Sequence, residues 1–154
     1  MDIAESELCK NSAGDGGAIF NNDGGILTIK KSTFGENTAE NGGSIFNNES
    51  DLIILDSIIN SSKAGENGGA IHNNSELSIT ASTLNFNKAN HYGGAIYNYK
   101  ADLAIEKSIL SENTAENGGA IHNYDAEMSV TGSVFEKNTA ENGAALNNVK
   151  NINR

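Results

Sequence analysis

The carboxylates are the first side chains in this sequence that could support chemistry. Hydrolase or lyase chemistry on sugar chains needs clustered carboxylates, usually with a lysine or arginine nearby. Six aspartates form no column on an expected strand face, and most fall at expected turns: Asp15, Asp23, Asp51, Asp56, Asp102 and Asp125. Four glutamates each precede an Asn-Gly step, where a solvated acidic edge is expected: Glu40, Glu66, Glu116 and Glu141. This arrangement predicts no catalytic residue.

Two histidines have the chemistry to ligate a metal ion. His72 and His122 occupy equivalent positions of an internal repeat, but Tyr97 takes the same position in the turn between them. A single ion would have difficulty reaching both ligands across that distance. The GGxGxD calcium-binding repeat is also absent from the sequence. We therefore expect no metal site and no cofactor.

A stripe of outward aromatic side chains is the candidate ligand-binding site. Its members recur at one position of the repeat and at a second position two residues further on: Phe20, Phe46, His72, Tyr97, His122, Tyr99 and Tyr124. A neighbouring column of alanine and serine is expected to leave this face flat. Such a stripe could bind a glycan or a partner protein. Alternatively, the aromatic pairs only stabilise the sheet, and the sequence leaves both interpretations open.

The internal repeat of 25 or 26 residues must position these side chains. Its clearest marks are pairs of small residues: Gly16-Gly17, Gly42-Gly43, Gly68-Gly69, Gly93-Gly94, Gly118-Gly119 and Gly143-Ala144. Each pair is followed by a small and an aliphatic residue, as in Ala70-Ile71. Two more apolar segments recur in each period, of the types Leu27-x-Ile29 and Ser32-x-Phe34. Alternation with a period of two predicts three short strands per repeat.

Three strands repeated in a fixed order favour a coil in which each strand pairs with its equivalent one period later. The expected fold is all-β, a right-handed single-stranded parallel β-helix of about six turns. A helical repeat is excluded because no period has the apolar spacing of a helix and every unit contains a glycine or Gly-Ala pair. Recurrent asparagines, such as Asn47 and Asn73, are expected to form hydrogen-bonded ladders at corners. Asn-Gly steps such as 67–68 are expected to supply positive φ at tight turns.

Composition excludes several classes of function. The formal net charge is −10 and the single arginine is Arg154, which argues against binding to nucleic acid or to an anionic membrane surface. No run is apolar enough to span a membrane. Cys9 is the only cysteine, so no disulfide framework is expected. The N-terminal residues lack the features of a signal peptide, so any export signal is expected outside this chain.

The two motifs of the repeat resemble a known family. GGAI occurs at 16–19, 68–71, 93–96 and 118–121, with GGSI at 42–45 and GAAL at 143–146. The second motif reads Phe34-Gly-Glu-Asn37 and Phe135-Glu-Lys-Asn138, with degenerate copies in the other turns. These motifs resemble the repeats of chlamydial polymorphic outer-membrane proteins and of adhesin-like surface proteins from archaea and other host-associated microbes. The resemblance implies an exported passenger or stalk region engaged in adhesion.

The functional expectation is therefore a structural or adhesive module, extracellular or at the cell surface, and not an enzyme. Its partner would be a glycan or a host or cell-surface protein. A polysaccharide lyase or hydrolase is the alternative, because right-handed β-helices also include such enzymes. Residues 1–154 are expected to form one β-helix domain that begins and ends within a turn, as a fragment of a longer protein. End-to-end association through uncapped ends is a further expectation.

Overall fold

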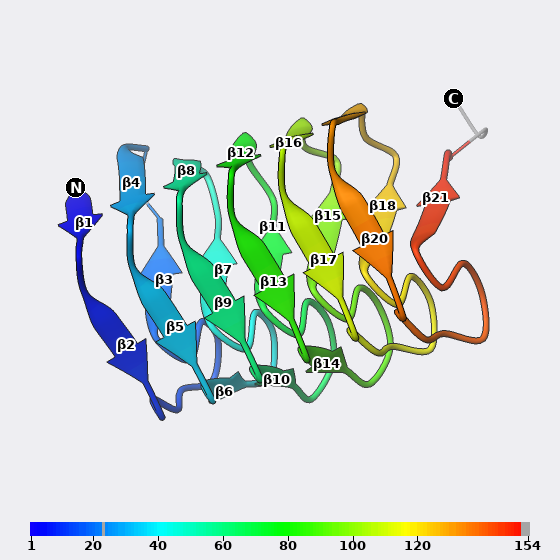
Figure 1. Cartoon of the computed structure of the whole chain (residues 1–154), viewed down its shortest axis with the longest axis horizontal. Coiled ribbons are helices and arrows are strands. Elements are labelled where there is room, and N and C mark those ends of the chain that lie inside the picture. The colour runs from blue at the N-terminus through cyan, green and yellow to red at the C-terminus, as the bar shows by residue number, and fades with distance from the viewer. Residues whose placement is uncertain (23, 152–154) are drawn as a thin grey trace.

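The computed structural model describes residues 1–22 and 24–151, so Asp23 and Arg154 lie outside the described residues. The described residues form twenty-one β-strands and no helix. The chain advances along one axis while its front strands descend and its rear strands ascend, which makes the coil right-handed (Figure 1). Each strand pairs in parallel with its equivalent one turn later. The predicted β-solenoid of about six turns is confirmed.

Two six-stranded parallel sheets form the front of the solenoid (Figure 1). Sheet 1 consists of β1 (Asp2–Ala4), β4 (Ile26–Lys30), β8 (Asp51–Leu55), β12 (Leu77–Thr80), β16 (Leu103–Glu106) and β19 (Met128–Thr131). Sheet 2 consists of β2 (Glu7–Cys9), β5 (Thr33–Gly35), β9 (Ile58–Asn60), β13 (Thr83–Asn85), β17 (Ile109–Ser111) and β20 (Val134–Glu136). These strands contain the two apolar segments that the repeat predicts.

A third six-stranded sheet lies behind them and contains the aliphatic residue that follows each glycine pair (Figure 1). Sheet 3 consists of β3 (Ile19–Asn21), β7 (Ile45–Asn47), β11 (Ile71–Asn73), β15 (Ile96–Tyr99), β18 (Ile121–Tyr124) and β21 (Leu146–Val149). A short sheet 4, which the sequence did not predict, consists of β6 (Thr38–Ala39), β10 (Lys63–Ala64) and β14 (Lys88–Ala89). Two-residue strands are too short to show an alternating pattern.

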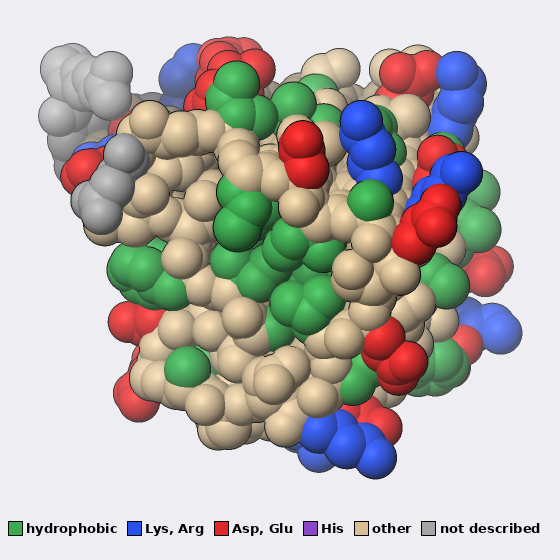
Figure 2. Space-filling view, turned by 90° about the vertical axis from the view of Figure 1, so that its left-hand side faces the viewer, with side chains coloured by type: hydrophobic (Ala, Val, Ile, Leu, Met, Phe, Trp, Pro, Cys, Tyr) green, Lys and Arg blue, Asp and Glu red, His purple; other side chains and the backbone are tan. Residues whose placement is uncertain are grey.

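The core is a stack of aliphatic columns. In β8, Leu52 and Ile54 are fully buried, whereas Ile53 between them is half-buried on the outer face. Leu52 lies opposite Leu77 in the next turn, and the same register holds along sheet 1. Burying such side chains stabilises the fold by roughly 1.5–3 kcal/mol each. Viewed along the axis from the N-terminal end, apolar side chains occupy the middle of the molecule (Figure 2).

Polar columns line the corners of this core. Each buried serine before sheet 2 accepts a hydrogen bond from the serine one turn earlier, as from Ser57 N to Ser82 Oγ at 3.1 Å. The Ser57 hydroxyl in turn donates to the carbonyl of Leu55 at 2.7 Å. The inner asparagine ladder runs the length of sheet 3: Asn21, Asn47, Asn73, Asn98, Asn123 and Asn148. The predicted asparagine ladders are confirmed.

The turns need positive φ at more positions than the sequence indicated. Gly68 has a φ of 67°, as its Asn-Gly step predicts. Three other corners place ordinary residues in the same conformation, for example Lys31 at 48°, Glu36 at 56° and Glu49 at 51°. Left-handed backbone costs roughly 1–2 kcal/mol for a non-glycine residue. Pairing with the neighbouring turns holds these corners in place, so a single sequence motif does not reveal them.

Candidate binding surface on sheet 3

The outer face of sheet 3 carries the predicted aromatic stripe. Strand alternation turns Ile71 and Asn73 inward and His72 outward. Parallel register then stacks the equivalent residues into one aromatic column: Phe20, Phe46, His72, Tyr97 and His122. Tyr99 and Tyr124 form a second pair two residues along the same strands. The structure therefore brings the seven predicted side chains together on one sheet.

Neighbouring rings in the aromatic column are in contact. The centroids of Phe20 and Phe46 lie 5.2 Å apart with an interplanar angle of 9°. Phe46 stacks on His72 at 4.5 Å and 22°, and His72 meets Tyr97 edge-on at 4.9 Å. Such pairs contribute about 0.5–1.5 kcal/mol beyond their buried area. Stacking is therefore part of what holds sheet 3 together.

The expected reason for a flat face was wrong. The alanine and serine column lies inside the solenoid, because Ser44, Ala70 and Ala95 have no exposed surface. The Ser44 hydroxyl lies 2.7 Å from that of Ser62 and accepts a hydrogen bond from Asn37 Nδ2 at 3.0 Å. The residue after the glycine pair faces inward because the backbone bends there, before the extended strand begins.

Exposure also varies strongly along the stripe, from 53% for Phe20 to 5% for His122. His122 is buried by Tyr92, whose ring centroid lies 4.6 Å from that of the histidine. Tyr92 also stacks on Tyr97, at 5.8 Å. Sequence reasoning did not include Tyr92 because it lies in the turn before the strand. The signal was nevertheless present, since Tyr92-Gly93 stands where four other turns have Asn-Gly.

All four tyrosines of the chain gather in this one region. Tyr92, Tyr97 and Tyr99 belong to a single turn, and we call them the tyrosine row. Tyr97 and Tyr99 have centroids 6.1 Å apart. Tyr99 stacks on Tyr124 at 5.5 Å and 11°, and Lys100 Nζ lies 5.1 Å from the centre of the Tyr99 ring. The region thus combines apolar rings with phenolic hydroxyl groups.

The region is electrically neutral at its centre. Burial lowers the pKa of His72 and of His122 to about 4, so both rings are uncharged near neutral pH. Burial raises the pKa of Tyr97 to about 12, so its hydroxyl group keeps its proton. His72 Nε2 pairs with Asn74 Oδ1 at 3.1 Å. The Nδ1 atoms of both histidines are buried without a hydrogen-bond partner among the described residues.

The carboxylates are more ordered than the sequence suggested. Asp51, Glu76, Asp102 and Glu127 each precede the first core residue of their turn in sheet 1, and register aligns them in one column. Glu76, Asp102 and Glu127 lie just before their strands, so the aspartates form no column of their own on a strand face, and the acidic column consists of aspartate and glutamate in alternation. This column borders a shallow groove of about 370 Å³ over β12, β16 and β19.

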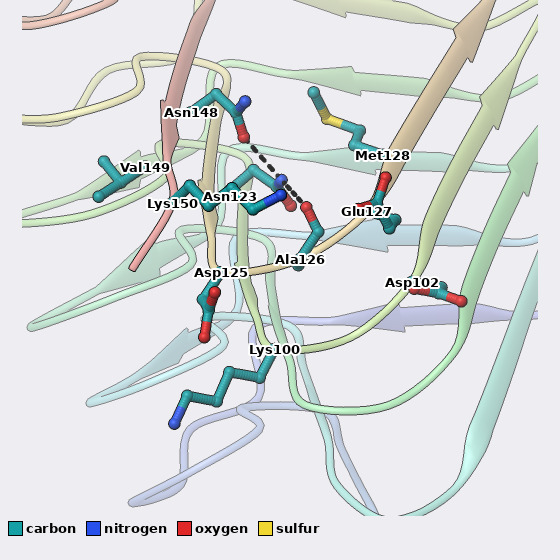
Figure 3. Close-up of a pocket in the computed structure, with 10 residues that line it drawn as sticks. All are labelled: Lys100, Asp102, Asn123, Asp125, Ala126, Glu127, Met128, Asn148, Val149 and Lys150. Atoms are coloured by element: carbon teal, nitrogen blue, oxygen red, sulfur yellow. Dashed lines mark hydrogen bonds between the residues drawn. The ribbon is translucent and has the colours of Figure 1, made fainter. Parts of the chain in front are cut away.

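A second hollow of about 450 Å³ lies near the C-terminal end, lined by Lys100, Asp102, Asp125 and Glu127 among others. Asp102 comes from one turn and Asp125 and Glu127 from the next, and the three carboxylates point in different directions (Figure 3). Asn123 is engaged with Asn148 and Ala126. No three metal-ligating side chains come together among residues 1–22 and 24–151. The hollow lacks the facing pair of carboxylates that sugar hydrolysis uses.

The architecture defines a parallel β-solenoid repeat protein. Residues 107–124, from the end of β16 to the end of β18, match the model of the Chlamydia polymorphic membrane protein repeat. No curated protein and no solved structure gives a significant match to the chain. The matched segment contains one copy of each motif, and it confirms the resemblance to the repeats of chlamydial polymorphic membrane proteins. In the described part of the chain, no helix is long and apolar enough to cross a membrane.

Proposed function

We propose that this chain is an adhesive repeat module of a surface protein and that the aromatic face of sheet 3 binds its partner. The solenoid and the family repeat fit a surface-protein module. The observation that carries the binding role is the gathering of all four tyrosines beside the aromatic column. Tyrosine is enriched among the side chains that dominate binding energy at interfaces.

The setting of these side chains supports the proposal. Phe46, His72, Tyr97 and His122 stand on strands that pair with both neighbouring turns, so little conformational entropy is lost when a partner binds. Phe20 is 53% exposed and Tyr92 is 39% exposed, which leaves apolar surface at the first ring of the column and beside Tyr97. The module would act outside the cell or on its surface, where the partner is a glycan or a host or cell-surface protein.

The test compares aromatic residues on different faces, of which Phe20 and Phe86 are equally exposed. Phe20→Ala and Tyr97→Ala remove rings from sheet 3, whereas Phe86→Ala removes a ring that is 52% exposed at a corner after sheet 2. Binding would be measured on glycan arrays and on immobilised extracellular-matrix proteins. We expect at least a tenfold loss for Phe20→Ala and Tyr97→Ala, with Phe86→Ala unchanged. Equal binding by all of the folded variants would show that the rings serve only to stabilise the sheet.

A further inference from the structure

We propose that Tyr92 anchors the partner and that the ligand is a polypeptide segment with basic side chains. This inference rests on the proposed binding role of the sheet 3 face. A column of turn residues runs beside the aromatic column, and we call this column of turn residues the turn ladder. Its members are Asp15, Asn41, Asn67, Tyr92, Asn117 and Asn142. Tyr92 is the member of this column that breaks its pattern.

Asparagine side chains link the turn ladder wherever two of them adjoin. Asn67 Nδ2 donates to Asn41 Oδ1 at 3.2 Å, and Asn142 Nδ2 donates to Asn117 Oδ1 at 2.9 Å. By the same pattern, the residue at position 92 would donate to Asn67 Oδ1. Tyr92 makes no such bond, and Asn67 Oδ1 is buried without a partner among the described residues. Asparagine at position 92 would therefore complete the hydrogen bonding of the turn ladder, because it could donate to Asn67 Oδ1.

Natural proteins break local structural rules mainly at functional sites, and Tyr92 gives up the ladder bond while its ring contacts Tyr97 and His122. Tyr92 extends the aromatic column sideways, so that three tyrosines cross the face within one turn. Their successive centroids lie 5.8 and 6.1 Å apart. Tyr92 leaves 39% of its surface exposed, which makes it the accessible member of a row whose other rings are held by the sheet. This is the arrangement of an anchor residue supported by rigid neighbours.

The ring geometry disfavours a sugar as the ligand. A sugar ring packs best on the open face of an aromatic ring, but the rings here cover one another's faces. Phe20 and Phe46 are stacked at 9°, and Tyr99 is covered by Tyr124 on one side with Lys100 over its ring. Apart from Phe20 at the open end of the column, which is 53% exposed, these rings present mainly their edges and hydroxyl groups outward. Apolar edges and hydroxyl groups suit the side chains and amides of a polypeptide.

The acidic side chains around Tyr92 indicate which kind of polypeptide would bind. The residues that precede the last five members of the turn ladder form an acidic column in which His91 is the exception: Glu40, Glu66, His91, Glu116 and Glu141. His91 Nδ1 lies 2.8 Å from Glu66 Oε2, which leaves Glu116 as the exposed carboxylate on the other side of Tyr92. The chain as a whole carries a formal net charge of −10. Lysine or arginine side chains would pair with this edge, and electrostatic steering would speed their arrival.

The test selects phage-displayed dodecapeptides on the intact chain and measures their affinities for three variants. Tyr92→Asn removes the ring contacts with Tyr97 and His122 but installs the ladder residue and gives Asn67 Oδ1 a donor, so the variant should stay folded with a thermal midpoint close to that of the original chain. Glu116→Gln removes the charge beside Tyr92, and Glu127→Gln removes a charge from the column on sheet 1 as the matched control. We expect selected peptides rich in arginine or lysine. Their binding should fall at least tenfold with Tyr92→Asn and severalfold with Glu116→Gln or added salt, and stay unchanged with Glu127→Gln.

Several results would overturn the inference, and they separate it from the proposed function. Peptides without basic residues, or no enrichment above the library background, would refute the ligand class. Full binding by Tyr92→Asn would refute the anchor. Glycan binding that is lost with Tyr97→Ala would refute a polypeptide ligand and leave the sheet 3 face as a binding site. If neither glycans nor peptides depend on Phe20 or Tyr97, the proposed function itself fails.

Discussion

Replacing Asn98 by alanine should show how much one rung of the inner asparagine ladder contributes to stability. Asn98 is completely buried. Its amide donates to Asn123 Oδ1 at 2.7 Å and to the carbonyl of Ala101, and its Oδ1 accepts from Asn73 Nδ2 at 2.7 Å. Alanine removes all three hydrogen bonds at once and leaves the backbone propensity of the strand nearly unchanged.

The expected loss follows from which atoms are left without partners. Asn73 Nδ2 keeps its bond to the carbonyl of Ser75, so it stays satisfied. Asn123 Oδ1 and the carbonyl of Ala101 lose the donors that Asn98 provided. A buried polar atom without a partner costs about 1–3 kcal/mol. Two such atoms predict a fall of about 2–6 kcal/mol in the free energy of unfolding.

Urea denaturation followed by far-UV circular dichroism would measure this change, read from the midpoint at constant slope. Asn142→Ala is the control, because it removes an amide-to-amide bond to Asn117 that is exposed to water. Water replaces that partner, so the control should lose less than about 1 kcal/mol. If Asn98→Ala lost no more than Asn142→Ala, the ladder would not be a source of stability and the reasoning would be wrong.

Two further predictions concern the glycine pairs and the histidines. A Cβ atom on Gly94 would lie 2.1 Å from the carbonyl oxygen of Gly119 in the next turn, whereas one on Gly14 would meet nothing within 4 Å. Gly94→Ala should therefore lower the free energy of unfolding by roughly 3 kcal/mol or more, measured by thermal or urea unfolding. Gly14→Ala should stay within about 1 kcal/mol of the original chain. Equal effects of the two substitutions would contradict the close packing of the turns. Because burial holds the pKa of His72 and His122 at about 4, below the 6.5 of the unfolded chain, the unfolded state takes up protons first as the pH falls. The free energy of unfolding should have its full value above about pH 6.5 and decline towards pH 4. His122→Asn should flatten that decline, measured as the urea midpoint at each pH. An unchanged pH profile in this variant would contradict the burial of the His122 ring.

Much of the fold could be predicted from the sequence because its pattern is periodic. Leu52 and Ile54 alternate with outward residues, and the same pair recurs one turn later as Leu77 and Ile79. In a solenoid, residues one period apart become direct neighbours, so alignment of the chain with itself reveals the strand register. Sheet 4 was missed because strands as short as Lys63–Ala64 show no alternation.

The candidate site could be predicted only in part. Register placed Phe46, His72 and Tyr97 in one column, as the spacing indicated. The spacing did not indicate that Tyr92 covers His122, because this contact joins a turn to a strand of the following turn. The acidic column at the start of sheet 1 is hard to recognise for a different reason: its members alternate in type, as Asp102 and Glu127 do, so neither aspartate nor glutamate by itself shows the period of the repeat.

The sequence by itself determined which residues share a column, because the period of the repeat and the alternation of each strand depend only on the order of residues. The tertiary structure decided how far each column is exposed and which columns touch, because these depend on how the turns fold back against the sheets. His122 shows the difference: its column was evident from the sequence, but its burial results from the ring of Tyr92 in the preceding turn. Asn67 is a second example, because only the stacking of the turns reveals that its Oδ1 atom is buried without a hydrogen-bond partner among the described residues.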